Sequence, residues 1–226
     1  MNSVWKKIAV VLTASVLTIG TASSASAHAG FDNRGVVPTK GTSSVVLLRI
    51  GHGCTAPDGV TKVGTHSVSA VIPVALLSAP ASAAMQIPGF TAVVTPSAEK
   101  DAAGISVSNI ITWTAKDDIF DVNPVGFAEF GIRGNWATAG KHWIDTTQVC
   151  RIATKTVTPA KMKTVTDPVT KAKIKAWFPA VTKTSYQELK ISWSVHDSAA
   201  ATVLSADKTA ETGPAPSITI AEPAVK

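Results

Sequence analysis

The stretch Ser67-Val68-Ser69-Ala70-Val71-Ile72 decides the fold class, because small polar and apolar residues alternate along it. Successive side chains on a β-strand point to opposite faces, so this pattern predicts a strand with one buried face. The stretch Ile191-Ser192-Trp193-Ser194-Val195 repeats the pattern late in the chain, with Trp193 on the apolar side. Both stretches therefore predict sheets that cover a hydrophobic core with one face.

Other short apolar runs extend this pattern in both directions along the chain. Turn residues such as Pro57-Asp58-Gly59 and Asn123-Pro124 separate most of them. Short strands at this spacing predict an all-β fold, a single β-sandwich of the immunoglobulin-like or cupredoxin-like kind. One short helix is expected between Ala75 and Ala84, limited by Pro80. The predicted strands are 44–50, 65–73, 91–95, 107–113, 127–132, 141–150, 189–195 and 217–220.

A lysine-rich segment interrupts the predicted strands at about residues 154–175. It contains six lysines and two prolines, and it predicts an exposed hairpin or loop inserted between core strands. Such a charged run is typical of a solvated face. The alternative is attraction to an acidic surface or partner.

The first 27 residues predict a secretory signal peptide. Lys6 and Lys7 form its basic end, and the apolar run at 8–19 is too short for a comfortable membrane span. Ala25 and Ala27 form the small-x-small pattern that precedes cleavage. The predicted mature chain is a single domain, residues 28–226, exported to the periplasm or to the cell exterior or wall. No later stretch predicts a membrane span.

Charge and cysteine usage narrow the function classes further. The formal charge of +6 falls to +4 without Lys6 and Lys7, which is too modest to indicate a nucleic-acid partner. Cys54 and Cys150 are the two cysteines, and an even pair in an exported chain predicts one disulfide. The alternative is a pair of copper thiolates.

Cleavage after Ala27 would make His28 the first residue of the mature protein. Its free α-amine and its ring Nδ1 can close one chelate ring on a metal ion. An α-amine with a pKa of about 8 deprotonates readily near neutral pH. This nitrogen pair favours Cu(II), the tightest binder among the first-row divalent ions. The alternative is that a histidine lies at the cleavage site by chance.

A second candidate ligand lies in Gly51-His52-Gly53-Cys54, at the end of a predicted strand. Flanking glycines let the backbone turn sharply, and a disulfide at Cys54 would hold the corner that presents the imidazole. The alternative is a polar loop residue. The other histidines and several tryptophans are not expected to be ligands. His66, His142 and His196 are expected on the surface, Trp113 and Trp193 in the core, and Trp136 half exposed.

The order of several motifs resembles the YcnI-like family of exported copper-binding domains. After Gly51-His52-Gly53-Cys54 come Ile87-Pro88-Gly89-Phe90, Ile111-Thr112-Trp113, Phe127-Ala128-Glu129-Phe130-Gly131, Gln148-Val149-Cys150 and Pro214-Ala215-Pro216. The resemblance covers roughly residues 28–150 and the tail. It implies a β-sandwich that holds one Cu(II) through a single-histidine brace. It also implies a copper chaperone or copper importer as partner.

The resemblance also implies particular site residues. The brace carries over to His28. A glutamate that serves as ligand in some members has no counterpart here, because Gly51-His52-Gly53 takes its place, and His52 is the substituted ligand. The family places a tryptophan beside the metal shortly after the second cysteine, and the first tryptophan after Cys150 here is Trp177. If Trp177 does not have this role, Trp143 is the next candidate.

Three functions follow from these observations. The first is an exported protein that binds Cu(II) for storage, trafficking or delivery, without enzymatic activity. The second is a histidine-brace copper oxidase that acts on polysaccharide, with His28 and His52 as the brace. The third is a metal-free β-sandwich for adhesion or wall association. No paired carboxylates, nucleophile motif or phosphate loop indicates other catalysis.

Overall fold

The computed structural model describes residues 29–78 and 82–225, so the predicted signal peptide and His28 lie outside the described residues. Its largest sheet has seven strands in the order β15-β16-β14-β11-β5-β8-β7, and all neighbours are antiparallel except β14 and β16. The strands of this sheet are β5 (Thr65–Pro73), β7 (Phe90–Pro96), β8 (Ser108–Ala115), β11 (Thr146–Thr158), β14 (Val181–Val195), β15 (Val203–Leu204) and β16 (Ala210–Pro214).

A second sheet has four antiparallel strands in the order β1-β2-β9-β6. These strands are β1 (Gly30–Phe31), β2 (Ser43–Ile50), β6 (Ala83–Ala84) and β9 (Ala128–Asn135). Two small ribbons complete the body: β3 (Cys54–Thr55) with β4 (Lys62–Val63), and β10 (Gly140–Trp143) with β17 (Ser217–Ile220). The described helical turns are η1 (Val74–Leu76) and η2 (Asp118–Phe120). No helix in the described ranges is long and apolar enough to cross a membrane.

The hydrophobic core lies between the two larger sheets. Val68, Ala70 and Ile72 are buried along β5 while the residues between them are less buried, as the alternation predicted. Phe130 of β9 packs against Trp113 of β8, with ring centroids 5.3 Å apart. Each sheet therefore buries one face against the other, and the prediction of an all-β sandwich is confirmed.

Two local predictions are wrong. In the described part of the range expected to be helical, Ala75 to Ala84, the structure has only the short turn η1 and then β6, which pairs with β9. Alanine favours helices, but Pro80 interrupts this stretch, and tertiary pairing with β9 outweighs the remaining helical propensity. Trp136 is 1% exposed rather than half exposed, and its Nε1 donates a hydrogen bond of 2.8 Å to the Ser44 hydroxyl. A buried indole needs such an acceptor.

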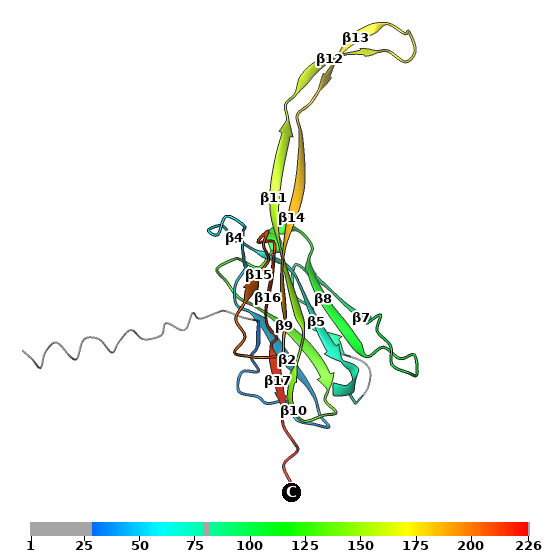
Figure 1. The fold of residues 1–226 in the computed structure, drawn as a ribbon. Coiled ribbons are helices and arrows are strands. Elements are labelled where there is room, and N and C mark those ends of the chain that lie inside the picture. The colour runs from blue at the N-terminus through cyan, green and yellow to red at the C-terminus, as the bar shows by residue number, and fades with distance from the viewer. Residues whose placement is uncertain (1–28, 79–81, 226) are drawn as a thin grey trace, which may run out of the picture.

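A long two-stranded projection leaves the sandwich (Figure 1). β11 and β14 stay paired as far as Thr158 opposite Val181, and the hairpin of β12 (Lys161–Thr166) and β13 (Lys173–Phe178) continues beyond them. The lysine-rich segment forms most of this projection. Residues 154–183 are called the arm from here on.

Candidate metal centre

The pairing of β1 with β2 determines which end of the sandwich holds the first described residues. Gly30 lies opposite Arg49 and Phe31 lies opposite Leu48, in antiparallel register. The N-terminal end of β1 therefore lies at the end of β2 that leads into Gly51 and His52. This pairing brings the first described residues and the candidate ligand His52 to the same end of one sheet.

His52 occupies a tightly defined corner between β2 and β3. Its backbone carbonyl accepts a hydrogen bond of 2.8 Å from Gln148 Nε2. Its ring Nδ1 hydrogen-bonds the carbonyl oxygen of Gly53. A carbonyl can only accept, so Nδ1 carries the proton and the lone pair of the neutral ring is on Nε2. This is the tautomer arrangement of many metal-binding histidines.

Gly53 is required at this corner because there is no room for a side chain. A Cβ built on Gly53 would lie 2.0 Å from the carbonyl oxygen of Val63 and 2.9 Å from Pro124 Cα. Both neighbours are backbone atoms that cannot move aside cheaply. The glycine that the sequence offered as a flexible turn residue therefore serves close packing, which holds the His52 backbone in position.

A disulfide joins Cys54 to Cys150, as predicted from the even cysteine pair. It connects β3 to β11 across 96 positions of sequence. Both cysteines are buried, and the Cys54 amide donates a hydrogen bond of 3.1 Å to Cys150 Sγ. Neither thiol is left to bind copper, so the thiolate alternative is excluded in this structure. The bridge holds the chain two residues after His52.

An acidic residue that the sequence did not single out lies within electrostatic reach of His52. Burial raises the pKa of Glu211, and electrostatic interactions with His52 and Lys62 partly oppose this rise. Glu211 belongs to β16, opposite Ile191 of β14. No motif marks this position, because β16 is a short strand that ends in Gly213 and Pro214.

Trp177 is not brought together with His52. It lies in β13, whose strand partner is β12 at the far end of the arm (Figure 1). Its side chain is 63% exposed. The expectation that Trp177 covers the metal is therefore not supported. Sequence distance after Cys150 was misleading because β11 runs past the sandwich before the chain reaches Trp177.

A different tryptophan lies beside the beginning of the described chain. Trp143 of β10 lines an open hollow together with Ala29, Pro214 and Ala215. The Trp143 ring stacks on the imidazole of His196, with centroids 5.9 Å apart and planes 8° apart. Trp143 is thus an aromatic residue adjacent to the N-terminal segment.

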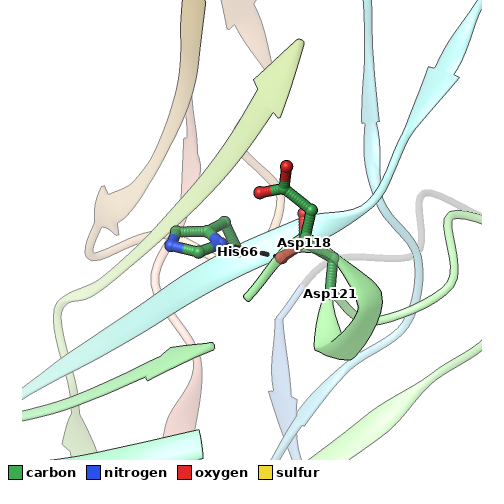
Figure 2. A group of neighbouring side chains, drawn as sticks. All are labelled: His66, Asp118 and Asp121. Carbon is green, nitrogen blue, oxygen red and sulfur yellow. Dashed lines mark hydrogen bonds and ion pairs between the residues drawn. The ribbon is translucent and has the colours of Figure 1, made fainter. Parts of the chain in front are cut away.

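His66, Asp118 and Asp121 form a second group of potential ligands (Figure 2). Their ligand atoms lie within 4.8 Å of one another, and His66 Nδ1 is 2.7 Å from Asp121 Oδ1. His66 is buried, in contrast to the expected surface position. Asp118 accepts hydrogen bonds of 2.9 Å from Arg151 and 2.8 Å from the Tyr186 hydroxyl. Protein contacts occupy both carboxylate oxygens of Asp118, so we assign the group to holding η2 against the base of the arm.

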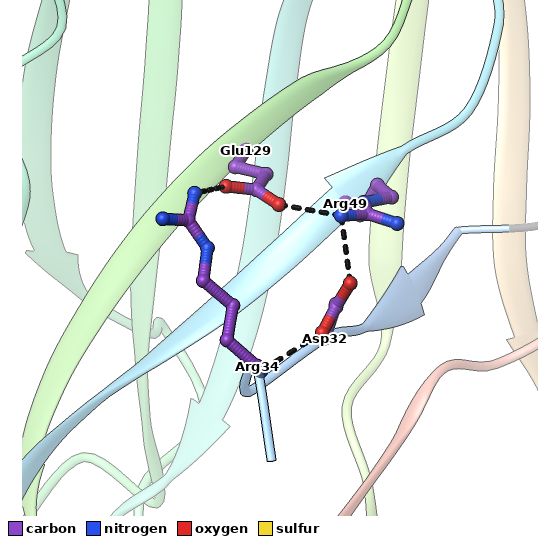
Figure 3. Close-up of polar contacts among 4 residues, drawn as sticks. All are labelled: Asp32, Arg34, Arg49 and Glu129. Carbon is purple, nitrogen blue, oxygen red and sulfur yellow. Dashed lines mark hydrogen bonds and ion pairs between the residues drawn. The ribbon is translucent and has the colours of Figure 1, made fainter. Parts of the chain in front are cut away.

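Four charged residues tie the N-terminal strand region to the sheet (Figure 3). Arg49 Nη2 lies 2.6 Å from Asp32 Oδ2 and 2.7 Å from Glu129 Oε1. Arg34 pairs with the other oxygen of Glu129. Hydrogen bonds from Arg49 and then Arg34 hold the pKa of Glu129 below its ordinary value of 4.5. The cluster joins the chain after β1 to β2 and β9.

This cluster predicts a pH-dependent contribution to stability. A carboxyl whose pKa is lower in the folded chain stabilises the fold above its unfolded pKa and loses that effect as the pH falls. Glu129→Gln should therefore lower the unfolding temperature at neutral pH, and the difference should shrink below about pH 4. Thermal unfolding followed by circular dichroism measures this, with Glu99→Gln as the control. A difference of the same size at pH 7 and pH 3 would contradict the assignment.

Comparison with known proteins gives information about the fold alone. No protein-family model matches the chain, and no curated protein sequence matches it. Among solved structures, the chain is similar to an uncharacterized protein from Nocardia farcinica whose crystal structure is described as an immunoglobulin-like fold. The two are 18% identical with a TM-score of 0.44, over 87% of this chain and 99% of that one. At this level of similarity no function passes from one protein to the other.

Proposed function

We propose that this chain is an exported copper-binding protein that holds one Cu(II) at its N-terminal corner. The observation that supports this most is the pairing of β1 with β2. It brings the N-terminal end of β1 to the His52 end of the sheet. A protein that begins at His28 would therefore start one residue before a segment that is already at this corner. The function is storage, trafficking or delivery of copper, with a copper chaperone or copper importer as the partner.

The donor atoms suit Cu(II) better than harder divalent ions. The α-amine and Nδ1 of His28 and the Nε2 of His52 are nitrogen donors, and imidazole ligands favour ions such as copper. Glu211 is an acidic residue within electrostatic reach of His52. Gln148 and Gly53 fix the His52 backbone, which reduces the cost of ordering this ligand when the ion binds.

The disulfide supports an exported location, because such bonds persist in oxidising compartments and are rare in the cytosol. It agrees with the predicted signal peptide and with maturation at His28. Export is also what makes the brace chemically available, because a chain that retained its first 27 residues would have an amide in place of the free amine. The proposed processing and the proposed metal site thus depend on each other.

Titration of Cu(II) into the mature chain tests the proposal. The chain beginning at His28 should bind one equivalent, and electron paramagnetic resonance should report nitrogen ligands. His52→Ala should weaken binding by at least about tenfold, or 1.4 kcal/mol, because one nitrogen donor is lost. The matched control is His142→Ala, whose ring contacts the carbonyl oxygen of Thr138 in the sandwich. No binding by the mature chain, or equal affinity of the two variants, would contradict the proposed site.

A further inference from the structure

The arm concentrates the positive charge of the protein. Residues 154–183 contain seven lysines and one acidic residue, Asp167, which gives a formal charge of +6. The whole chain has 21 lysines and arginines against 15 acidic residues, also +6. The remaining residues are therefore balanced at 14 of each sign. A charge separation of this kind directs the arm, and not the sandwich, toward anionic partners.

Large apolar side chains are exposed along the same arm. Trp177 is 63% exposed, and Met162, Val157 and Val181 are also exposed. Val169, in the turn between β12 and β13, is 85% exposed. Scattered single apolar residues are normal on a protein surface, but several on one narrow ribbon, a tryptophan among them, are typical of an interaction site.

The apolar residues lie on both faces of the β12–β13 hairpin. Trp177 is opposite Met162, so these two share a face, and Lys175 is on that face as well. Phe178 is on the other face, where Lys163 Nζ lies 5.2 Å from its ring centroid. A folded protein partner or a stiff polymer covers one face of a ribbon. Two faces of this composition require an environment that surrounds the hairpin.

We propose that the arm binds the surface of a lipid bilayer with anionic headgroups, and that the β12–β13 hairpin embeds in the headgroup region. Lysine ammonium groups pair with lipid phosphates there while their methylene stems lie along apolar surface. Tryptophan and phenylalanine are favoured at the same depth, between water and hydrocarbon. The headgroup region is mixed in polarity on all sides, which matches the two faces of the hairpin.

Side-chain contacts at the base of the arm fix the direction in which the arm leaves the sandwich. Arg151 of β11 and Tyr186 of β14 both donate hydrogen bonds to Asp118 of η2, and the Arg151 guanidinium lies 4.3 Å from the centroid of the Tyr186 ring. These contacts fix both strands of the ribbon to the sandwich where the arm begins. The arm then projects away from the sandwich, and its hairpin is the part farthest from it (Figure 1). Contact through the hairpin leaves the N-terminal corner of the sandwich free of the membrane.

Vesicle flotation with the mature chain tests this proposal without copper. The chain should bind vesicles of phosphatidylcholine with phosphatidylglycerol, bind pure phosphatidylcholine weakly, and lose affinity as salt is added. The variant Lys163→Glu/Lys175→Glu should bind at least roughly 25-fold more weakly, from about fivefold for each lysine removed from the surface. The matched control, Lys116→Glu/Lys190→Glu, makes the same charge change on exposed residues of the sandwich and should bind like the unchanged protein.

Tryptophan fluorescence provides a second readout of the same contact. Trp113, Trp136 and Trp193 are buried, so vesicle binding should shift the emission to shorter wavelengths mainly through Trp177. Trp177→Phe should remove that shift, and Trp143→Phe should keep it. Failure to bind anionic vesicles, or equal binding by the two charge-reversal variants, would overturn the proposal. Binding to a soluble acidic protein or polymer with no binding to vesicles would overturn it as well. None of these outcomes bears on the copper site, because no measurement includes copper.

Discussion

One alanine added before His28 should lower the Cu(II) affinity of the mature protein by orders of magnitude. The proposed brace needs the α-amine and the imidazole on the same residue, because only that pair closes the small chelate ring. The added residue converts the amine into an amide, which is a poor donor unless copper displaces its proton. The imidazole of His28 remains, so a loss of affinity isolates the chelate effect from the loss of a side chain. Isothermal titration with Cu(II) measures the difference.

Two controls make this result specific. His28→Ala retains the terminal amine and removes the imidazole, and it should weaken binding to a similar extent. Neither change alters a described core residue or a cysteine, so thermal unfolding without metal should stay the same. Equal affinity for Cu(II) with and without the added alanine would contradict the brace and the copper-binding function built on it. The vesicle binding of the arm would be unaffected by that outcome.

Removal of the disulfide should have the largest effect on stability. The bridge between Cys54 and Cys150 closes a loop across 96 positions, which contains β4 to β10. In the chain-entropy model a loop of this length contributes about 4–5 kcal/mol, because the bridge restricts the unfolded chain. That is a large fraction of the 5–15 kcal/mol by which a typical domain is stable. The variant Cys54→Ala/Cys150→Ala should therefore unfold at much lower urea concentration.

The double variant is preferable to either single one, because a single substitution leaves a thiol free to form intermolecular bonds. Thiol titration of the unfolded, unreduced parent should find no free thiol, as the structure has both cysteines in the bridge. Equal urea midpoints for the parent and the double variant would contradict the stabilising role. Reduction of the parent should reproduce the midpoint of the variant, which separates loss of the bridge from loss of the sulfur atoms.

Sequence periodicity predicted strand positions best where a strand has one buried face. The run at 65–73 coincides with β5, and 217–220 coincides with β17. Trp113 and Trp193 are in the core as expected. The run at 141–150 is instead divided into β10 and β11, which belong to different sheets. The residue pattern of a segment does not show which strands the segment pairs with. Here the first part of the run pairs with β17 and the second part with β5 and β14.

The site was predictable only in parts. The even cysteine count correctly predicted the disulfide, whereas the close packing that requires Gly53 beside His52 was not predicted. The electrostatic interaction between Glu211 and His52 was not predictable from the sequence, because it depends on the parallel pairing of β16 with β14. Trp177 was assigned from its order after Cys150, although the arm takes it away from the sandwich.

The sequence by itself determined the strand-rich fold class, the buried face of the regular strands, the cysteine pair and the exposure of the lysine-rich segment. These properties depend on residue types and on a period of two, which are local. Only the tertiary structure decided that the N-terminal end of β1 meets the His52 corner, that Trp143 rather than Trp177 lies beside this segment, and that His66 is buried against Asp121. Each of these joins residues far apart in the chain, and such neighbours follow from strand order and register across the whole sandwich.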